Sequence, residues 1–503
     1  MKQAVFFTTA KGNHYFYSPF RKQFILCHPL IDFFYHLEQK KISVVTWMQS
    51  LDPTLPLTLD NGLSFTPDSI HDQVIKYKFY KRSGYFKSVN SLNFNGKILP
   101  STIEKNIGSI QQVIFEVTES CNFACSYCTY SKFYNNKPRG NKTFRFEDAK
   151  KILETILSKR EKKKKDVLIV SFYGGEPLKN FSFIKQTVEY LKSYSSNQTT
   201  FRFNMTTNGL LLKRYIPFLV EHSFDISISL DGDEIANSFR KLKNHNPSFP
   251  IIHQIIDDIR KTYPVFFDKK VSFLSVMHNK NNPASAYRFF HNEYNKSTAT
   301  SDINTQNIAE AYKQEFYDTF LADPVRDPAE KKTMKTLLLK HPKVKELSYM
   351  AEKYSGVLFE DYYQLMKNHS NGKATKSYIP TATCSPFSLR TYFTADGSIL
   401  PCEHINRIFE IGTWAKGEMR IDITGIANQY NHYYQKIRKY CEQCYMAENC
   451  KECIFHTGIE NEHPQCELFM NKHKFEQYLS GNFSTIENDY ALFLRITDHA
   501  FKE

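Results

Sequence analysis

Three cysteines, Cys121, Cys125 and Cys128, stand within eight residues and have the spacing Cys-x3-Cys-x2-Cys. They follow the strand-like run QVIFEV at 112–117, so their thiolates can point at a single metal centre. A mononuclear zinc site needs a fourth ligand, which the neighbouring sequence does not offer, whereas an iron-sulfur cubane held by three thiolates leaves one iron open. We therefore expect a [4Fe-4S] cluster with one iron free for an outside ligand, with zinc as the alternative.

A glycine pair and a carboxylate follow the next strand-like run. VLIVSFY at 167–173 leads into Gly174, Gly175 and Glu176. Paired glycines let a backbone approach a ligand closely, and a carboxylate at this point can accept hydrogen bonds from an ammonium group. This strand end is therefore a second candidate part of a ligand site.

Hydroxyl and amide side chains mark the ends of two later runs. Thr207 and Asn208 come after TTFRFNM at 199–205, and Ser229 lies in FDISISL at 224–230. Such side chains could bind ribose or carboxylate oxygens. They extend the candidate site to two more strands.

Strand-like and helical patterns alternate from about residue 110 to residue 280. VSFLSVM at 271–277 is the fifth strand-like run, and the helical patterns lie near 145–160, 181–194, 210–221 and 250–262. Such alternation predicts βα units around a parallel sheet, with ligands at the carboxyl ends of the strands. The candidate residues all lie at such ends, so we expect them to share one site.

The triad, with aromatic Tyr127 just before its last cysteine, resembles the signature of the radical S-adenosylmethionine (SAM) superfamily. The resemblance implies an α/β fold, a partial (β/α)6 barrel, in which the cluster and the segment Gly174 to Glu176 bind SAM. In that family Ser-Leu-Asp-Gly often continues into His-Asp-x-x-Arg, but this chain lacks the His-Asp pair and reaches Arg240 one residue early. We expect Arg240 to clamp the SAM carboxylate and Ser229 to assist, with a surface role for both as the alternative.

Seven more cysteines lie in the last 120 residues, with the pattern Cys-x12-Gly-x4-Cys followed by two CxxC pairs and a final cysteine. This pattern resembles the SPASM domain, the auxiliary-cluster module of radical SAM enzymes that modify peptides and proteins. A zinc ribbon is the alternative. The resemblance implies two auxiliary [4Fe-4S] clusters, one held by Cys441, Cys444, Cys450 and Cys466 and the other by Cys384, Cys402 and Cys453. The second set is one thiolate short of the pattern in sulfatase-maturating relatives, so we expect either an open iron or a non-cysteine ligand there.

The first hundred residues contain three short alternating runs, AVFFTT, HYFYS and QFILC, and helical stretches near 29–39 and 43–50. This arrangement partly resembles the winged-helix leader-recognition domain of enzymes that modify ribosomally made peptides, which accept the leader as an added strand. A small structural cap is the alternative. The expected organisation is an N-terminal winged-helix-like α+β recognition domain at 1–100, the radical SAM barrel at 108–300, a helical linker or insertion at 301–380, a SPASM domain at 381–485 and a tail at 486–503. Further helices are expected near 306–321, 327–340 and 466–480.

Composition narrows the class of protein. Hydrophobic residues make up 41% of the chain, and no run approaches the roughly 18 apolar residues of a membrane span, so we expect a cytoplasmic protein without a membrane contact. Its eleven cysteines have spacings that suit metal in a reducing compartment better than disulfides. The net charge of +14 would suit an acidic partner, but the densest run, KREKKKK at 159–165, closes an amphipathic stretch. We interpret that run as a solvated helix end, so nucleic acid is not a favoured partner.

The resemblance implies a radical SAM peptide maturase. SAM would be cleaved reductively to a 5′-deoxyadenosyl radical, with an electron from an external donor such as flavodoxin or ferredoxin. The radical would remove hydrogen from a ribosomally made precursor peptide held through its leader, and the product would be a crosslink, thioether, epimer or oxidised residue. The alternatives are a formylglycine-forming enzyme of the sulfatase-maturating type, an RNA-modifying radical SAM enzyme and a non-catalytic zinc-binding protein. No acid or base is assigned from the sequence.

Overall fold

The structure is a computed structural model that describes residues 1–60, 62–90, 93–135, 140–160, 166–194, 199–305, 307–321, 378–447, 450–489 and 491. The expected helix near 327–340, most of the 301–380 insertion, residues 161–165 of the basic run and most of the 486–503 tail lie outside these residues. In the described part of the chain, no helix is both long enough and apolar enough to cross a membrane. The described residues divide into two compact units, one made of residues 1–97, 378–382 and 434–491 and the other of residues 98–321 and 383–433.

The second unit is built on a ten-stranded sheet with the order β11-β10-β9-β8-β7-β6-β12-β13-β14-β15. The strands from β11 to β6 all pair in parallel. Their bounds are Gln112–Thr118 for β6, Asp166–Gly174 for β7, Thr199–Thr207 for β8, Asp225–Ser229 for β9, Val271–Met277 for β10 and Thr298–Asp302 for β11. The mostly parallel sheet confirms the predicted α/β class and the five predicted strands. The sequence did not indicate β11, because its run TATSD is polar and mostly exposed.

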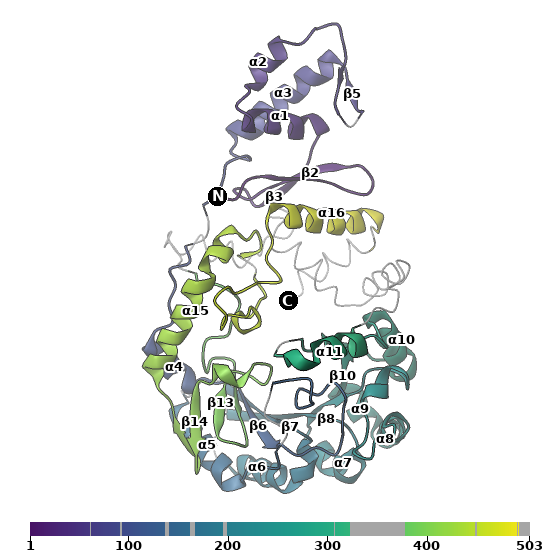
Figure 1. The fold of residues 1–503 in the computed structure, drawn as a ribbon, viewed down its shortest axis with the longest axis vertical. Coiled ribbons are helices and arrows are strands. Elements are labelled where there is room, and N and C mark those ends of the chain that lie inside the picture. Colours follow the sequence, from purple (N-terminus) through teal and green to yellow (C-terminus); the bar gives the residue numbers. More distant parts are fainter. Residues whose placement is uncertain are drawn as a thin grey trace. The chain divides into compact units, whose positions relative to one another are not determined.

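Helices cover the outer face of these strands, as the ribbon of Figure 1 shows for α5 to α8. Their bounds are Phe146–Lys159 for α5, Phe181–Ser193 for α6, Leu212–Glu221 for α7 and Phe249–Thr262 for α8, which confirms the four predicted helices. Alternate strand residues point outward into this layer, where Phe115 packs against Phe144 and Phe183. The other strand face looks into the barrel. The sequence did not indicate α9 (Pro264–Lys270) or α10 (Pro283–Tyr294).

An antiparallel extension continues the sheet beyond β6. β12 pairs with β6 in parallel, and the remaining strands pair antiparallel. Their bounds are Arg390–Phe393 for β12, Ser398–Leu400 for β13, Gly412–Ala415 for β14 and Glu418–Arg420 for β15. These strands have three or four residues each, too few to show a period in the sequence. The extension therefore brings the C-terminal region against the first strand of the barrel.

The first unit contains a three-stranded antiparallel sheet of β1 (Val5–Thr8), β2 (His14–Ser18) and β3 (Gln23–Leu26). One face packs on α1 (Pro29–Gln39) and α3 (Pro67–Arg82) through a cluster that includes Phe16 and Phe34. The other face packs on α16 (Lys472–Asn488) through Val5, Phe7 and Leu479. The three predicted strands are confirmed, as are the predicted helix at 29–39 and the short helix α2 (Val44–Gln49). The hairpin of β4 (Leu57–Thr58) and β5 (Ser64–Phe65) and the helix α3 were not predicted.

The remaining helices correct two expectations. The predicted helix near 306–321 is shorter, as the turn Glu310–Tyr312 followed by α11 (Lys313–Phe320). The final helix α16 begins later than predicted, because Asn471 caps it and the residues after Cys466 form a loop. The helix α15 (Ile423–Gln443), with 21 residues, was not predicted. The short helix α4 (Pro100–Ile107) precedes β6.

Candidate functional site

The cysteine triad lies in the loop after β6, and this loop is paired along its backbone with residues 239–243. The amide of Ala124 donates to the carbonyl of Lys241 at 2.8 Å, and the amide of Ser126 donates to the carbonyl of Phe239 at 2.9 Å. None of the three triad cysteines forms a disulfide. The loop therefore has a fixed course set by a segment more than a hundred residues away.

Asn208 is brought from the end of β8 to the first triad cysteine. Its side-chain amide donates to the Asn122 side-chain oxygen at 2.7 Å and approaches the Cys121 sulfur at 3.7 Å. The backbone amide of Phe123 also points at this sulfur, at 3.4 Å. Hydrogen bonds to sulfur are one of the protein's means of tuning an iron-sulfur cluster. The thiols, with donors directed at Cys121, thus fit a thiolate-held cluster.

Gly174 and Gly175 bring the end of β7 close to β6. Gly174 has φ +128°, and a Cβ there would lie 2.5 Å from the carbonyl oxygen of Thr118. The amide of Gly175 donates to that same carbonyl at 2.7 Å. Only glycine fits at the first position, so the pair lets β7 approach β6 closely, while the predicted close approach to a ligand stays a prediction.

Glu176 is fully buried, and its carboxylate ties the end of β7 to the end of β8. It accepts hydrogen bonds from the Thr207 hydroxyl at 2.8 Å, the Asn208 amide at 2.8 Å and the Leu178 amide at 3.1 Å. Burial raises the pKa of Glu176 to about 7, against the opposing effect of these three donors. The Glu176 carboxylate therefore binds protein groups. The part of the segment Gly174 to Glu176 that can contact a ligand is the glycine backbone.

A buried polar hub lies beside the triad, centred on Asp231. The fully buried Asp231 carboxylate accepts a hydrogen bond from the Tyr127 hydroxyl, pairs with the Arg240 guanidinium at 3.0 Å and accepts from the Val276 amide at 3.0 Å. His278 at the end of β10 is buried with its Nε2 3.7 Å from the same carboxylate. Burial opposes ionisation of Asp231, but Arg240 and the hydrogen bonds keep its pKa below the ordinary value. Tyr127 and Arg240, both predicted site residues, meet here.

Sequence reasoning missed His278 and gave Asp231 no role. The signal for Asp231 was its position two residues after the predicted Ser229, which the structure places half-buried at the end of β9. His278 follows directly on β10. A polar residue within two positions of each strand end was the usable signal for both.

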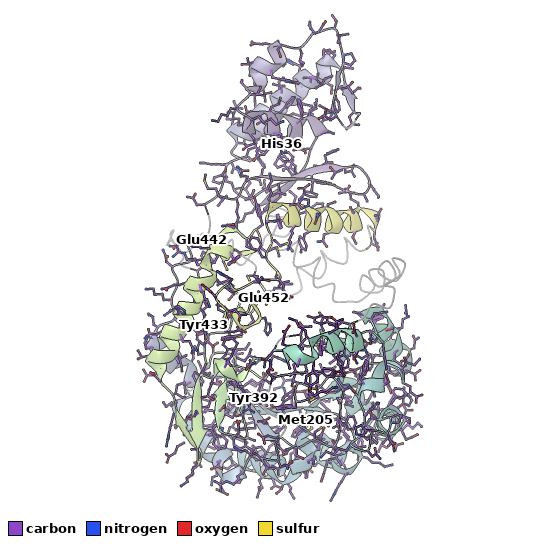
Figure 2. All side chains as sticks on the ribbon, viewed as in Figure 1. His36, Met205, Tyr392, Tyr433, Glu442 and Glu452 are labelled. Atoms are coloured by element: carbon purple, nitrogen blue, oxygen red, sulfur yellow. The ribbon has the colours of Figure 1, made fainter. Side chains whose placement is uncertain are left out.

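A second buried carboxylate, Glu116, faces the inside of the barrel from β6. It accepts hydrogen bonds from the Ala395 amide at 2.9 Å and from the Tyr130 hydroxyl at 3.3 Å, and Arg407 lies 3.7 Å away. Burial raises the pKa of Glu116. The Ala395 amide and the Arg407 charge act in the opposite direction but do not cancel this rise. Tyr392 of the neighbouring strand β12 is buried beside this group, and its position in the second unit is labelled in Figure 2. The lone acidic residue in QVIFEV was the sequence signal for Glu116.

Four cysteines of the first unit line one cavity of about 170 Å³. They are Cys441, Cys444, Cys450 and Cys466. Backbone amides donate to two of their sulfurs, from Glu452 at 3.4 Å and from Met470 at 3.5 Å. Burial raises the pKa of Cys441 and of Cys466 to about 12. Four thiols that receive N–H donors in one cavity fit an iron-sulfur group, and Phe94, Tyr440 and Leu468 are among the other lining residues. The described residues contain no group of three His, Cys, Asp or Glu side chains placed to hold a single metal ion.

The other predicted cysteine set is divided between the two units. Cys384 and Cys402 belong to the second unit and Cys453 to the first. Cys384 is exposed, and Cys402 is followed by Glu403, which pairs with Arg390 at 3.0 Å. The second Glu403 carboxylate oxygen is buried with no hydrogen-bond partner. A cluster at these three cysteines stays a prediction.

Comparison with known proteins places this fold and site in a class. Residues 115–290 match the Radical SAM superfamily, so the chain contains a radical SAM domain, and the resemblance predicted from the triad is confirmed. The fold resembles the solved structure of native anSMEcpe with bound AdoMet, with a TM-score of 0.50 and 16% identity over 78% of this chain and 99% of that one.

Three relatives share sequence with the chain. An uncharacterised protein of Methanocaldococcus jannaschii is 30% identical over 179 residues, 35% of this chain and 56% of the relative. The cysteine-type anaerobic sulfatase-maturating enzyme of Clostridium novyi is 24% identical over 317 residues, 59% of this chain and 74% of the relative. The radical SAM cyclopropyl synthase TigE of Paramaledivibacter caminithermalis is 24% identical over 186 residues, 33% of this chain and 39% of the relative. The chain thus spans about half or less of the length of two of these relatives.

Proposed function

We propose that this chain is a radical SAM enzyme that modifies a ribosomally made peptide. The observation that carries the proposal is the meeting of three cysteine thiols, a glycine pair and polar strand ends at the carboxyl edge of one parallel sheet, within a radical SAM domain. Cys121, Cys125 and Cys128 would hold a [4Fe-4S] cluster. When bound there, the cluster and SAM would supply a 5′-deoxyadenosyl radical for hydrogen abstraction.

The chain's own residues would prepare the seat for SAM. The Glu176 carboxylate accepts hydrogen bonds from Thr207 and Asn208, so it would hold the ends of β7 and β8 at a fixed distance. The backbone of Gly174 and Gly175 would then receive the methionine amino group, because no side chain stands in the way. The barrel interior beside Glu116 would receive the peptide.

The SAM site is tested by anaerobic reconstitution with iron and sulfide, followed by reduction in the presence of SAM. We expect 5′-deoxyadenosine to form. Replacement of the three triad cysteines by Ala should abolish it, whereas Cys27→Ala, a lone cysteine outside the clusters, should not. If no 5′-deoxyadenosine forms when candidate peptide is supplied, the proposal is wrong.

Two observations support a peptide substrate. The relatives include proteins named as a sulfatase-maturating enzyme and a cyclopropyl synthase. The N-terminal unit offers an edge strand, β3, with Leu26 62% exposed, and the neighbouring helix α3 exposes Ile75 and Phe79. Ile25 of β3 packs against the same hydrophobic cluster as Val74 of α3, so α3 lies close to this edge. A leader peptide would add as a fourth strand along β3.

Leader binding is tested with a fluorescently labelled precursor peptide encoded beside the gene. Phe79→Asp should weaken binding at least tenfold, because the charge would lie on the apolar surface that α3 exposes. Val265→Asp is the control, since Val265 is an apolar residue on α9 that is 66% exposed, against 52% for Phe79. Equal binding by wild type and Phe79→Asp would refute this docking mode.

The auxiliary clusters, an external electron donor such as flavodoxin and a cytoplasmic location complete the proposal. The four-cysteine cavity supports one cluster. Full reconstitution should give about twelve irons per chain if three cubanes form, while stoichiometric zinc without iron would identify a zinc-binding protein instead.

A sulfatase-type maturase is the second candidate. The match to the Clostridium novyi enzyme, over 59% of this chain, favours it. The seven C-terminal cysteines, one fewer than in that group, argue against it. A cysteine-containing sulfatase peptide separates the two, since only a maturase of this type converts the cysteine to formylglycine.

A further inference from the structure

Cys125 and Arg240 face each other across a short antiparallel ribbon. The bridge between Phe123 and Leu242 sets the register, and the flanking pairs 124:241 and 126:239 are joined by hydrogen bonds. Cys125 and Arg240 therefore form the pair between these bonds. Side chains of such a non-hydrogen-bonded pair lie on one face and approach more closely than any other cross-strand pair.

The Arg240 guanidinium is held in place on this face. Asp231 binds it at 3.0 Å, and its central carbon lies 5.4 Å from the centre of the Tyr127 ring. Its Nε is buried and has no hydrogen-bond partner. An oriented buried cation with an unused N–H thus stands opposite a predicted cluster ligand.

We infer that Arg240 is the charge partner of the Cys125 thiolate and, with Asp231 as its counter-charge, sets the reduction potential of the triad cluster. The inference rests on the proposed cluster at the triad. It differs from the clamp on the SAM carboxylate that the sequence resemblance implied, because the guanidinium is already bound by Asp231 and aligned with the cysteine loop. Reduction adds negative charge to the cluster, so a nearby cation favours the reduced state and a nearby anion opposes it. Arginine suits this role because it stays protonated at all working pH values.

The test is an anaerobic redox titration of reconstituted full-length protein, which follows the EPR signal that changes shape when SAM is added. Arg240→Gln leaves Asp231 unbalanced and should lower the potential. Asp231→Asn leaves Arg240 unbalanced and should raise it. The double variant removes both charges and should return the potential close to that of the wild type, as should Arg240→Lys, which keeps the cation. Shifts of opposite sign that cancel are not expected from a loss of structure, which would move both single variants in the same direction.

The outcomes separate this inference from the proposed function. If no SAM-sensitive cluster signal forms in the wild type, the cluster proposal fails. If the signal forms and the two single variants shift together or not at all, the role of Arg240 is refuted while the cluster stands.

A second measurement covers the case in which a single variant does not take up its cluster, since removal of one partner from a buried ion pair is costly. Pulsed EPR of the reduced wild type with ¹⁵N-labelled arginine should show a nitrogen coupling to the cluster, and Arg240→Lys should lose it. Absence of that coupling in the wild type would overturn the assignment.

Discussion

The pH dependence of stability should be strongest at Glu176, because the pKa of its buried carboxylate is about 7 in the folded protein against an ordinary value of 4.5. A carboxyl group whose pKa is raised by folding binds its proton more tightly in the folded state. Between pH 4.5 and 7 the folded chain therefore carries the extra proton, and the free energy of unfolding falls as the pH rises through that window. The shift predicts a loss of about 2–3 kcal/mol between pH 5 and pH 8 from this one group.

Glu176→Gln removes the titration and keeps one oxygen acceptor, whereas the carboxylate uses one oxygen for Thr207 and Leu178 and the other for Asn208. The difference in unfolding free energy between wild type and variant should therefore change by about 2–3 kcal/mol from pH 5 to pH 8. The change has one sign, because the wild type becomes less stable relative to the variant as the pH rises. Tryptophan fluorescence offers an assay confined to the second unit. The chain has two tryptophans, and a Trp47→Phe background leaves Trp414, which stacks on Phe144 at 4.4 Å.

Urea unfolding of the apo protein at the two pH values gives the free energies, and equal slopes show that the same transition is compared. Glu189→Gln is the matched control, since Glu189 is an exposed carboxylate on α6 of the same unit. A pH-independent difference between wild type and Glu176→Gln would mean that the three donors outweigh burial and that Glu176 is ionised throughout.

Three further changes test other parts of the structure. Gly174→Ala should reduce SAM binding below detection in equilibrium dialysis, because the added Cβ would lie 2.5 Å from a β6 carbonyl oxygen. Gly481→Ala should bind SAM normally, because a Cβ added there would have no atom within 4 Å. Leu479→Ala should destabilise the first unit by about 2–5 kcal/mol in a urea titration followed by circular dichroism, since Leu479 is fully buried against the N-terminal sheet. Lys474→Ala, at an exposed position of the same helix, should have little effect. Cys444→Ala should lower the iron content of reconstituted protein by about four atoms per chain, and an unchanged content would refute a cluster in that cavity.

The fold was most predictable where burial is two-sided. In β6 and β7 the apolar run continues for most of the strand, because both faces are covered, and such runs are typical of parallel strands. The strand β11 and the short strands β12 to β15 were not predicted, because they lack such long apolar runs. They are polar or have three or four residues, and the sheet that they join supplies the stability that their own sequence lacks.

Site residues were predictable when their neighbours in sequence were also their neighbours in space. The triad and the Gly174 turn are local, so spacing alone pointed to them. The pairing of Cys125 with Arg240 depends on two loops that approach across more than a hundred residues, and no spacing reveals its register. The same holds for His278, whose partner Asp231 follows another strand, β9.

Glu116 shows how the C-terminal region completes the barrel. A carboxylate in the middle of a buried strand is costly unless it is paired and hydrogen-bonded. Its partners, the Ala395 amide and the Arg407 guanidinium, come from the β12 extension, nearly three hundred residues further along the chain. The same extension covers the edge of β6 through the parallel pairing of β12. A barrel that ended near residue 321 would thus leave both an unpaired buried charge and an open strand edge. This dependence explains why residues 98–321 and 383–433 form one compact unit.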